Sequence, residues 1–324
     1  MSKFQTLLLF CLVMSCNVFA EGIDISKEYL LTKTQIQNES FNGELLKSYL
    51  KNQTVLLIPG VLSQSFSSTA SQRIKLNLVL GEIFDDHENW LIEEDVNYEK
   101  IELESEASPE ENADFIIEVL EDMPDNIIIF THSKGGIDTF QALSKKPELL
   151  EKISGIITVQ TPFKGSPIAE DFSNNFLTRQ LGNWLFNLLG GSPEGIDSLT
   201  QSASKKRNEI LEDQYKYIIS KVPVINFGSF KEDTFGWDSP LELFRDIADK
   251  KSGPNDGVVP LTSAFLDETY QVTEANVDHL LSVTSCKGIR KLGFYPKLKY
   301  SERWTYDREA HFKALLESLR KVSY

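Results

Sequence analysis

The stretch Asn126-Ile-Ile-Ile-Phe-Thr-His-Ser-Lys-Gly-Gly136 indicates how this chain folds. Its apolar run from Asn126 to Phe130 predicts a buried strand, and the run from Ile137 to Leu143 predicts a helix. Ser133 lies between the two, and Gly135 is the second residue after it. A serine in a tight turn from strand to helix is typical of a nucleophile elbow, whose strained backbone pushes the hydroxyl clear of the sheet.

The residues on either side of this serine refine the prediction. Lys134 follows it, and the backbone N–H of Lys134 would point to the place where an oxyanion forms, with the helix N-terminus beneath. The elbow pattern has a glycine two residues before the serine, whereas this chain has the larger, β-branched Thr131. An ordinary glycine-rich turn is therefore the alternative, and the rest of the chain must decide between them.

The first twenty residues have the composition of an export signal. Lys3 gives a short basic start, and Leu7–Met14 lies in an apolar stretch that is too short to span a bilayer. Val18–Ala20 fits a cleavage site before Glu21. We therefore expect a signal peptide at residues 1–20 and an exported protein, periplasmic or secreted. The second choice is a lipoprotein that is anchored through Cys16.

Composition limits what the remaining residues, 21–324, can form. If cleavage follows Ala20, Cys286 is the last cysteine left, so no internal disulfide can form. The remaining length is sufficient for a full core without disulfides, and it suits one α/β domain with an insertion. The net charge of −15 argues against nucleic acid as a partner, because the phosphates would be repelled.

Apolar runs and helical spacings alternate along the chain. Besides the elbow strand, the sequence predicts strands at Thr54–Ile58, around 96–104, Gly155–Gln160, Val222–Phe227 and Tyr270–Thr273. It predicts helices at Ile74–Phe84, at 108–122 behind a Ser108–Glu111 capping box, and at Asp307–Lys321. We assign no element to residues 21–51. The alternation predicts an α/β fold in which helices cover both faces of a mostly parallel sheet.

The segment from about 166 to 211 carries an apolar stripe at helical spacing. The stripe contains Phe176, Leu177, Leu181, Trp184, Leu185, Leu188 and Leu189. One interpretation is a helical cap, or lid, over the serine, with the stripe facing an acyl chain. The other is a crossover helix packed on the sheet. A further turn or helix is expected from Leu199 to about Leu211.

A serine hydroxyl needs a base to remove its proton, and that base needs a carboxylate to fix its tautomer. His279, just past the last predicted strand, is the best candidate for the base. His132 lies on the wrong side of the elbow to reach the hydroxyl, and His87 is expected in a polar loop. His311 is expected within the C-terminal helix, at the surface or in packing.

In this type of fold the acid follows the nucleophile and precedes the base along the chain. Asp256 stands out because it lies in Gly253–Pro260, a turn that would hold its carboxylate in place to accept an imidazole N–H. Asp238, Asp267 and Asp278 are the other candidates. Alternatively, Asp256 serves its own turn as an Asx-turn residue.

Five motifs occur in a fixed order: Thr131–Gly136, Thr161–Ser166, Asp197–Thr200, Asn255–Val259 and Asp278–Leu280. Together they resemble the bacterial triacylglycerol lipases of the α/β-hydrolase superfamily, over roughly Val55 to Ser282. The resemblance implies an α/β-hydrolase fold with a helical cap or lid. It also implies Ser133 as nucleophile, Asp256 as acid and His279 as base.

The resemblance further implies where an oxyanion hole and a lid would lie. Pro59–Val61 would be the oxyanion loop, with the backbone N–H groups of Val61 and Lys134 as donors, and the lid would follow Ser166. Several such lipases bind a structural calcium through an aspartate two residues after the histidine, where this chain has Leu281. We therefore predict no calcium site of that kind, no other metal site and no cofactor.

These features predict an exported serine hydrolase that cleaves carboxylic esters of lipids through an acyl-enzyme. The expected partner is a lipid or another ester, with transient contact to a membrane or lipid interface. An acyltransferase or phospholipase of the same fold is an alternative, because a different acceptor or head group would use the same acyl-enzyme. A non-catalytic binding module that keeps the fold is another. The sequence leaves open the acyl-chain length and the oligomeric state.

Overall fold

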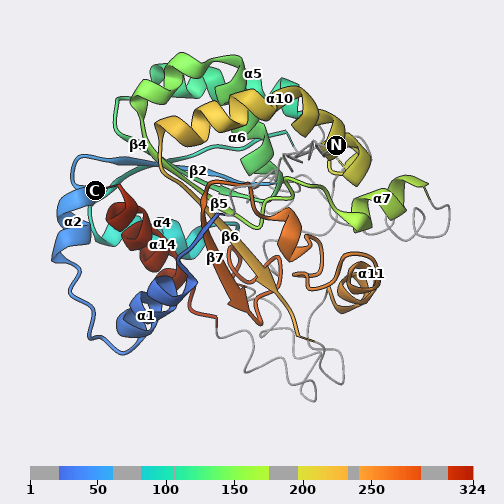
Figure 1. Ribbon diagram of the computed structural model, residues 1–324. Helices are drawn as coiled ribbons and strands as arrows, with labels where there is room; N and C mark the ends of the chain where they lie inside the picture. Colours follow the sequence, from blue (N-terminus) through green and yellow to red (C-terminus); the bar gives the residue numbers. More distant parts are fainter. Residues whose placement is uncertain are drawn as a thin grey trace, which may run out of the picture.

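The computed structural model describes residues 22–60, 82–104, 107–174, 196–232, 241–285 and 306–323 (Figure 1). At the centre of these residues lies a seven-stranded sheet in the order β1-β7-β6-β5-β4-β2-β3, and every neighbouring pair is parallel. The strands are β1 (Ile23–Asp24), β2 (Thr54–Ile58), β3 (Asn97–Lys100), β4 (Ile127–His132), β5 (Ile153–Val159), β6 (Val224–Phe230) and β7 (Tyr270–Ala275).

Helices cover both faces of this sheet (Figure 1). One face carries α1 (Ser26–Gln37), α2 (Glu44–Leu50), α4 (Asp85–Glu93) and α14 (Arg308–Val322). The other carries α5 (Pro109–Asp122), α6 (Lys134–Lys145) and α10 (Gln201–Lys221). Two more helices, α7 (Pro167–Asn174) and α11 (Glu242–Ser252), pack on each other. Short 3-10 turns span Pro147–Lys152 and Leu261–Ser263.

The central strands divide their side chains between two hydrophobic cores. In β2, Val55 and Leu57 belong to the core beneath α1, α2, α4 and α14, whereas Leu56 and Ile58 belong to the core beneath α5, α6 and α10. β4 alternates in the same way. Successive side chains of a strand point to opposite faces, so a continuous apolar run is what a strand covered on both faces requires.

The architecture confirms the predicted fold class of a mostly parallel sheet with helices on both faces. The predicted capping box is also present at the start of α5. The hydroxyl of Ser108 accepts from the backbone N–H of Glu111 (3.3 Å), and the Glu111 carboxylate accepts from the backbone N–H of Ser108 (2.8 Å). The two groups satisfy each other's donors at the helix end.

Several predicted boundaries are wrong. The helix expected to reach Phe84 does not, because Ile83 bridges to Thr284 and Phe84 has a φ of +68°; the remainder of that prediction lies outside the described residues. The helix expected to end near Leu211 continues as α10 to Lys221. The strand around 96–104 is confined to β3 at the sheet edge. Residues 21–51, left unassigned, contribute β1, α1 and α2.

Candidate active site

Ser133 occupies a strained turn between β4 and α6. Its backbone has φ +54° and ψ −129°, and a positive φ is uncommon for any residue other than glycine. The backbone N–H of Ser133 donates to the carbonyl of Val159 in β5 at 2.9 Å, which ties the turn to the neighbouring strand. Ser133 as a whole residue is 7 % exposed. The predicted elbow geometry is therefore present at this serine.

Close backbone approaches around the elbow occur at glycines. A Cβ on Gly60, at the end of β2, would lie 2.6 Å from the Cβ of Ser133, and a Cβ on Gly136 would lie 2.2 Å from the Thr161 hydroxyl. Neither distance is possible for a real side chain without movement. Thr131, which takes the place of the expected glycine, is instead a fully buried residue of β4. The elbow thus has its tightest approaches at positions other than 131.

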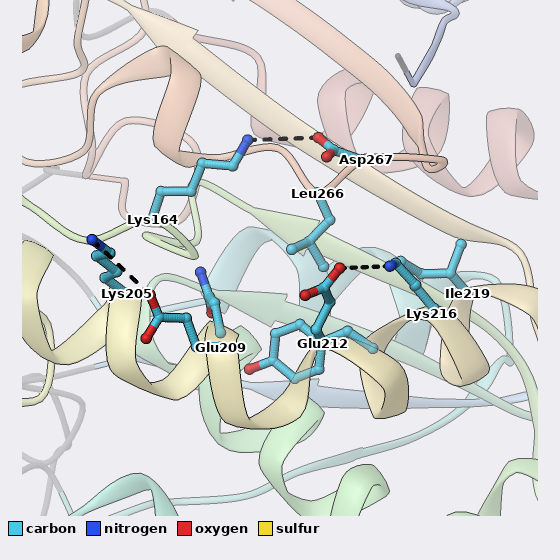
Figure 2. A pocket seen from close by; sticks show the side chains of 10 residues that line it. Lys164, Lys205, Glu209, Glu212, Lys216, Ile219, Leu266 and Asp267 are labelled. Carbon is cyan, nitrogen blue, oxygen red and sulfur yellow. Dashed lines mark hydrogen bonds and ion pairs between the residues drawn. The ribbon is translucent and has the colours of Figure 1, made fainter. Parts of the chain in front are cut away.

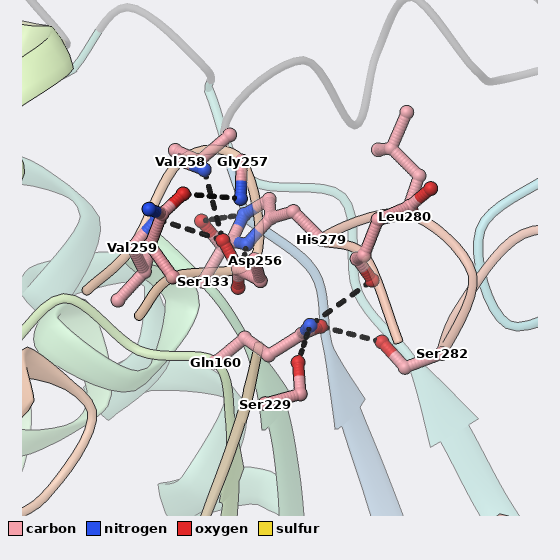
Figure 3. Close-up of polar contacts among 12 residues, drawn as sticks. Ser133, Gln160, Ser229, Asp256, Gly257, Val258, Val259, His279, Leu280 and Ser282 are labelled. Carbon is pink, nitrogen blue, oxygen red and sulfur yellow. Dashed lines mark hydrogen bonds and ion pairs between the residues drawn. The ribbon is translucent and has the colours of Figure 1, made fainter. Parts of the chain in front are cut away.

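Three side chains that are far apart in the sequence meet at this elbow (Figure 3). The Nε2 atom of His279 lies 3.0 Å from the Oγ of Ser133, and its Nδ1 atom lies 2.8 Å from Oδ2 of Asp256. All three are buried. We call this group the serine cluster. Because Ser133 follows β4 and the other two follow β6 and β7, the cluster forms where the carboxyl ends of parallel strands meet.

The turn around Asp256 holds its carboxylate in one orientation. Oδ1 accepts from the backbone N–H groups of Val258 (2.9 Å) and Val259 (2.7 Å), while Oδ2 faces the His279 ring. The backbone N–H of His279 also donates to the backbone carbonyl of Asp256 at 2.9 Å. Asp256 is therefore both an Asx-turn residue and the partner of the imidazole, so the two interpretations of this aspartate are compatible.

His132 packs directly against His279. Their ring centroids are 4.7 Å apart, and Nε2 of His132 lies 2.9 Å from the backbone carbonyl of His279. A carbonyl can only accept, so Nε2 must carry the proton. Burial, and to a smaller extent the neighbouring His279 ring, holds the pKa of His132 well below its usual value, so the His132 ring is neutral near pH 7. His132 thus supports the main chain of His279.

The other candidates for acid and base lie elsewhere. Asp278 accepts from the backbone N–H groups two and three residues after it, whereas Asp267 pairs with Lys164 at 3.7 Å. Asp238 lies outside the described residues. His87 was expected in a polar loop, but it is fully buried in α4. His311 is packed in α14, with Nδ1 2.6 Å from the Tyr29 hydroxyl.

Lys134 presents its backbone and its side chain to different surroundings. As the first residue of α6, it has an N–H that no carbonyl within the helix accepts. Its ammonium group is buried and donates to both carboxylate oxygens of Asp138, at 2.9 and 2.8 Å. Burial raises the pKa of the Asp138 carboxyl, and the Lys134 charge opposes that rise. Asn112 of α5 donates to the same carboxylate at 2.8 Å.

Several predicted residues lie outside the described part of the chain. They are the signal-peptide residues and Cys16, the oxyanion residue Val61, and the cap residues Phe176, Leu177, Leu181, Trp184, Leu185 and Leu188. Of the segment predicted to be a cap, the described part contains α7 and the start of α10. α10 packs on α6 and the sheet through Tyr215 and Ile218. The apolar stripe, to which the cap and crossover interpretations refer, lies outside the described residues.

A pocket of about 420 Å³ lies along α10 (Figure 2). Tyr215, Ile219 and Leu266 give it an apolar lining, and charged pairs such as Lys216–Glu212 surround them.

Among the described residues, no group of three or more His, Cys, Asp or Glu side chains is arranged to hold a metal ion. Leu281, where the sequence lacks the aspartate considered above for calcium, is buried in the core. No helix of the described chain combines the length and apolarity needed to cross a membrane.

Gln160 is a residue at this site that sequence reasoning did not select. It directly follows β5, is fully buried, and has a φ of +52°. Its side chain contacts Ser229, Ser282 and the backbone of Asp278. Its position in the sequence could have indicated this role, because Gln160 is a polar residue at the end of an apolar strand. Ligand-binding and catalytic groups gather at the edge of a parallel sheet where such strands end.

Comparisons with known proteins agree with the fold. No protein-family model matches the chain, and neither does any curated protein. Among solved structures, a metagenomic carboxyl esterase is similar with a TM-score of 0.63 and 22% identity, over 83% of this chain and 76% of that one. The mature form of a Bacillus licheniformis lipase is similar with a TM-score of 0.55 and 20% identity, over 73% of this chain and 87% of that one. Lipase 1 from Pelosinus fermentans is similar with a TM-score of 0.52 and 13% identity, over 83% of this chain and 98% of that one. These similarities show the α/β-hydrolase fold.

Proposed function

We propose that this chain, which has the α/β-hydrolase fold, is an exported serine hydrolase that cleaves carboxylic esters of lipids through an acyl-enzyme. The observation that carries the proposal is the serine cluster. In it, the His279 imidazole contacts both the Ser133 hydroxyl, which lies in the strained turn, and the Asp256 carboxylate, which its own turn holds in place. The names of the structural neighbours, a carboxyl esterase and two lipases, support the same class of substrate.

The first step is attack by Ser133 on the ester carbonyl. As the Oγ–carbon bond forms, the hydroxyl proton moves to Nε2 of His279, 3.0 Å away. Asp256 accepts a hydrogen bond from the Nδ1–H of the same ring, and the proton stays on the ring. This hydrogen bond leaves Nε2 free to act as the base and stabilises the imidazolium that results. The carbonyl oxygen becomes an oxyanion, toward which the backbone N–H of Lys134 and, by the resemblance, that of Val61 would donate.

The remaining steps return the enzyme to its starting state. The tetrahedral intermediate collapses as the carbon–oxygen bond to the alcohol breaks, and His279 gives its Nε2 proton to the departing alcohol. Water then attacks the acyl-enzyme, with His279 accepting a proton from that water. When the bond to Ser133 breaks, the proton passes from His279 to the serine oxygen, and the carboxylic acid leaves.

Export is part of the proposal and has its own test. The basic start, the short apolar stretch and the small residues ending at Ala20 support a cleaved signal peptide. Mass spectrometry of the protein recovered from outside the cytoplasm should find Glu21 at the N-terminus. A mature chain that begins at a lipid-modified Cys16 would instead support the lipoprotein alternative and contradict cleavage after Ala20.

The catalytic assignment is tested at the nucleophile. Ser133→Ala should abolish hydrolysis of p-nitrophenyl esters and labelling by a fluorophosphonate probe, because no other group supplies the attacking oxygen. Ser220→Ala, at an exposed position near the end of α10, is the matched control and should keep both. Turnover that survives in Ser133→Ala would refute the assignment. A folded wild-type protein that the probe does not label would favour a binding module.

The class of ester follows from a second measurement on the wild-type enzyme. Rates on esters of increasing acyl length should be compared for dissolved and emulsified substrate. A rise in rate when the substrate forms an oil–water interface is expected for an enzyme that acts on lipids. Activity restricted to short, dissolved esters would contradict the lipid part of the proposal. Product analysis with added alcohol would show acyl transfer if a new ester forms.

A further inference from the structure

Gln160 lies at the sheet edge where the serine cluster is assembled, and its conformation is unusual. The side chain is fully buried, and the backbone has a φ of +52° although the residue is not glycine. Its backbone N–H donates to the carbonyl of Phe227 in β6 at 2.8 Å. A polar side chain held in this way at the end of an apolar strand points to a role beyond filling the core.

The amide of Gln160 makes three hydrogen bonds (Figure 3). Its nitrogen donates to the hydroxyl of Ser229 in β6 at 2.6 Å and to the backbone carbonyl of Asp278 at 3.1 Å. Its oxygen accepts from the hydroxyl of Ser282 at 2.6 Å. Because the Asp278 carbonyl can only accept, the nitrogen must be the atom that faces it, and this fixes the orientation of the amide.

Two of these contacts fall on either side of His279. Asp278 precedes it and Ser282 follows it in residues 276–282, which we call the base loop. We propose that Gln160 is a positioning residue, which holds the base loop on the sheet so that Nε2 of His279 faces the Ser133 hydroxyl. This inference rests on the function proposed above, because it concerns the base of that reaction.

Removing the Gln160 amide would affect catalysis through the position of the base loop. Without Gln160, the base loop would lose the hydrogen bonds to the Asp278 carbonyl and from the Ser282 hydroxyl. Losing a buried hydrogen bond favours movement of the loop toward water. A displacement of about 1 Å between reacting groups can lower a rate by about 100-fold. Because His279 acts in proton transfer, the loss should fall on kcat and leave KM nearly unchanged.

Three variants test this role. Gln160→Met keeps the length of the side chain and removes all three hydrogen bonds, Ser282→Ala removes one tie to the base loop, and Ser229→Ala removes only the tie to β6. We expect Gln160→Met to lower kcat by about 10- to 100-fold with KM within about threefold. Ser282→Ala should show a smaller loss of kcat, and Ser229→Ala should stay within about threefold of wild type.

A proton NMR measurement gives a readout that does not depend on turnover. The imidazole N–H between His279 and Asp256 should exchange faster with water in Gln160→Met and should be unchanged in Ser229→Ala. Wild-type kcat and exchange in Gln160→Met would overturn the proposal, as would equal losses of kcat in Gln160→Met and Ser229→Ala. If Gln160→Met does not fold, Ser282→Ala compared with Ser229→Ala decides in the same way.

The same experiment separates this inference from the proposed function. If the wild-type protein hydrolyses no ester and takes up no fluorophosphonate, the proposed function fails. The exchange rate of the His279 proton would still show whether Gln160 positions the base loop. If the wild-type protein is active and the variants behave alike, the proposed function stands and the role of Gln160 fails.

Discussion

Each residue of the serine cluster is held by different local chemistry. Ser133 is fixed by a strained backbone, and Asp256 by two N–H groups of its own turn. His279 is held by its neighbours: Asp256 accepts from its backbone N–H, and His132 donates to its carbonyl. The buried geometry of the serine cluster therefore does not depend on the rotamer preferences of the three side chains alone.

Replacing Asp256 by asparagine should remove activity while keeping the turn. The amide oxygen can still accept from Val258 and Val259, so the amide nitrogen would face Nδ1 of His279 and could only donate to it. The ring would then carry its proton on Nε2 and could not accept the one on Ser133. We expect kcat on p-nitrophenyl esters to fall by about 10⁴-fold, with an unchanged circular dichroism spectrum.

The matched control for that variant is Asp267→Asn. Asp267 was another candidate acid, but it is exposed and pairs with Lys164 at 3.7 Å, and such pairs contribute little. Its kcat should stay within about twofold of wild type. A loss of activity in Asp267→Asn comparable to that in Asp256→Asn would contradict the assignment of the acid.

Sequence reasoning could select the three residues of the serine cluster because each lies in a recognisable sequence pattern. The elbow glycines identify Ser133, the Gly/Pro/Asn turn identifies Asp256, and chain order identifies His279. The ties that hold His279 could not be found in this way. Gln160 reaches across to Asp278, 118 residues away, and no local periodicity records such a contact.

At the scale of elements, a hydrogen bond from α5 to a buried ion pair within α6 joins these two helices in addition to their apolar contacts. The Lys134–Asp138 pair is 1 % exposed at both side chains, and Asn112 of α5 donates to the same carboxylate. A buried pair with satisfied hydrogen bonds can hold helices in register, but each partner depends on the other.

Asp138→Ala should therefore be strongly destabilising. It leaves the Lys134 ammonium buried without its carboxylate, and breaking a buried pair in this way costs about 3–5 kcal/mol of unfolding free energy. The double variant Lys134→Met with Asp138→Leu removes both charges and should recover most of that loss. Urea unfolding of the three proteins measures the effect. A double variant no more stable than Asp138→Ala would show that the buried charge is not the cause.

One of the missed elements, α1, shows a physical reason why sequence reasoning did not find it. In α1, the buried positions are Tyr29, Thr32 and Lys33, so an apolar stripe is absent from its sequence. Lys33 and Tyr29 instead bond the Glu274 carboxylate of β7. A helix that packs through polar contacts gives no periodic signal, whereas the doubly covered strands gave continuous apolar runs that were read correctly.

At the scale of the whole molecule, the core beneath α4 and α14 contains an ionisable ring. His87 is fully buried among Phe84, Phe130 and Phe312, with ring centroids 4.7–5.5 Å away. Neither ring nitrogen has a hydrogen-bond partner among the described residues. Burial lowers the pKa of His87 from 6.5 to about 3, and it lowers those of His132 and His311 in the same direction.

These depressed pKa values make the fold sensitive to acid. The unfolded chain takes up a proton at His87 once the pH falls below 6.5, but the folded chain does not until about pH 3. The contribution of His87 to stability is therefore fully present above pH 6.5 and is lost as the pH falls toward 3. Between pH 7 and pH 5 this single residue should account for about 2 kcal/mol of lost unfolding free energy.

His87→Leu isolates that contribution, because leucine has a similar volume and does not titrate. The free energy of unfolding in urea should fall about 2 kcal/mol less between pH 7 and pH 5 in the variant than in the wild type. Leu91→Ala, in the same helix and equally buried, is the control: it should lose about 2–5 kcal/mol at both pH values and keep the wild-type pH dependence. If His87→Leu keeps that dependence as well, the acid sensitivity arises from other groups, and the ring at position 87 is not held neutral by its surroundings.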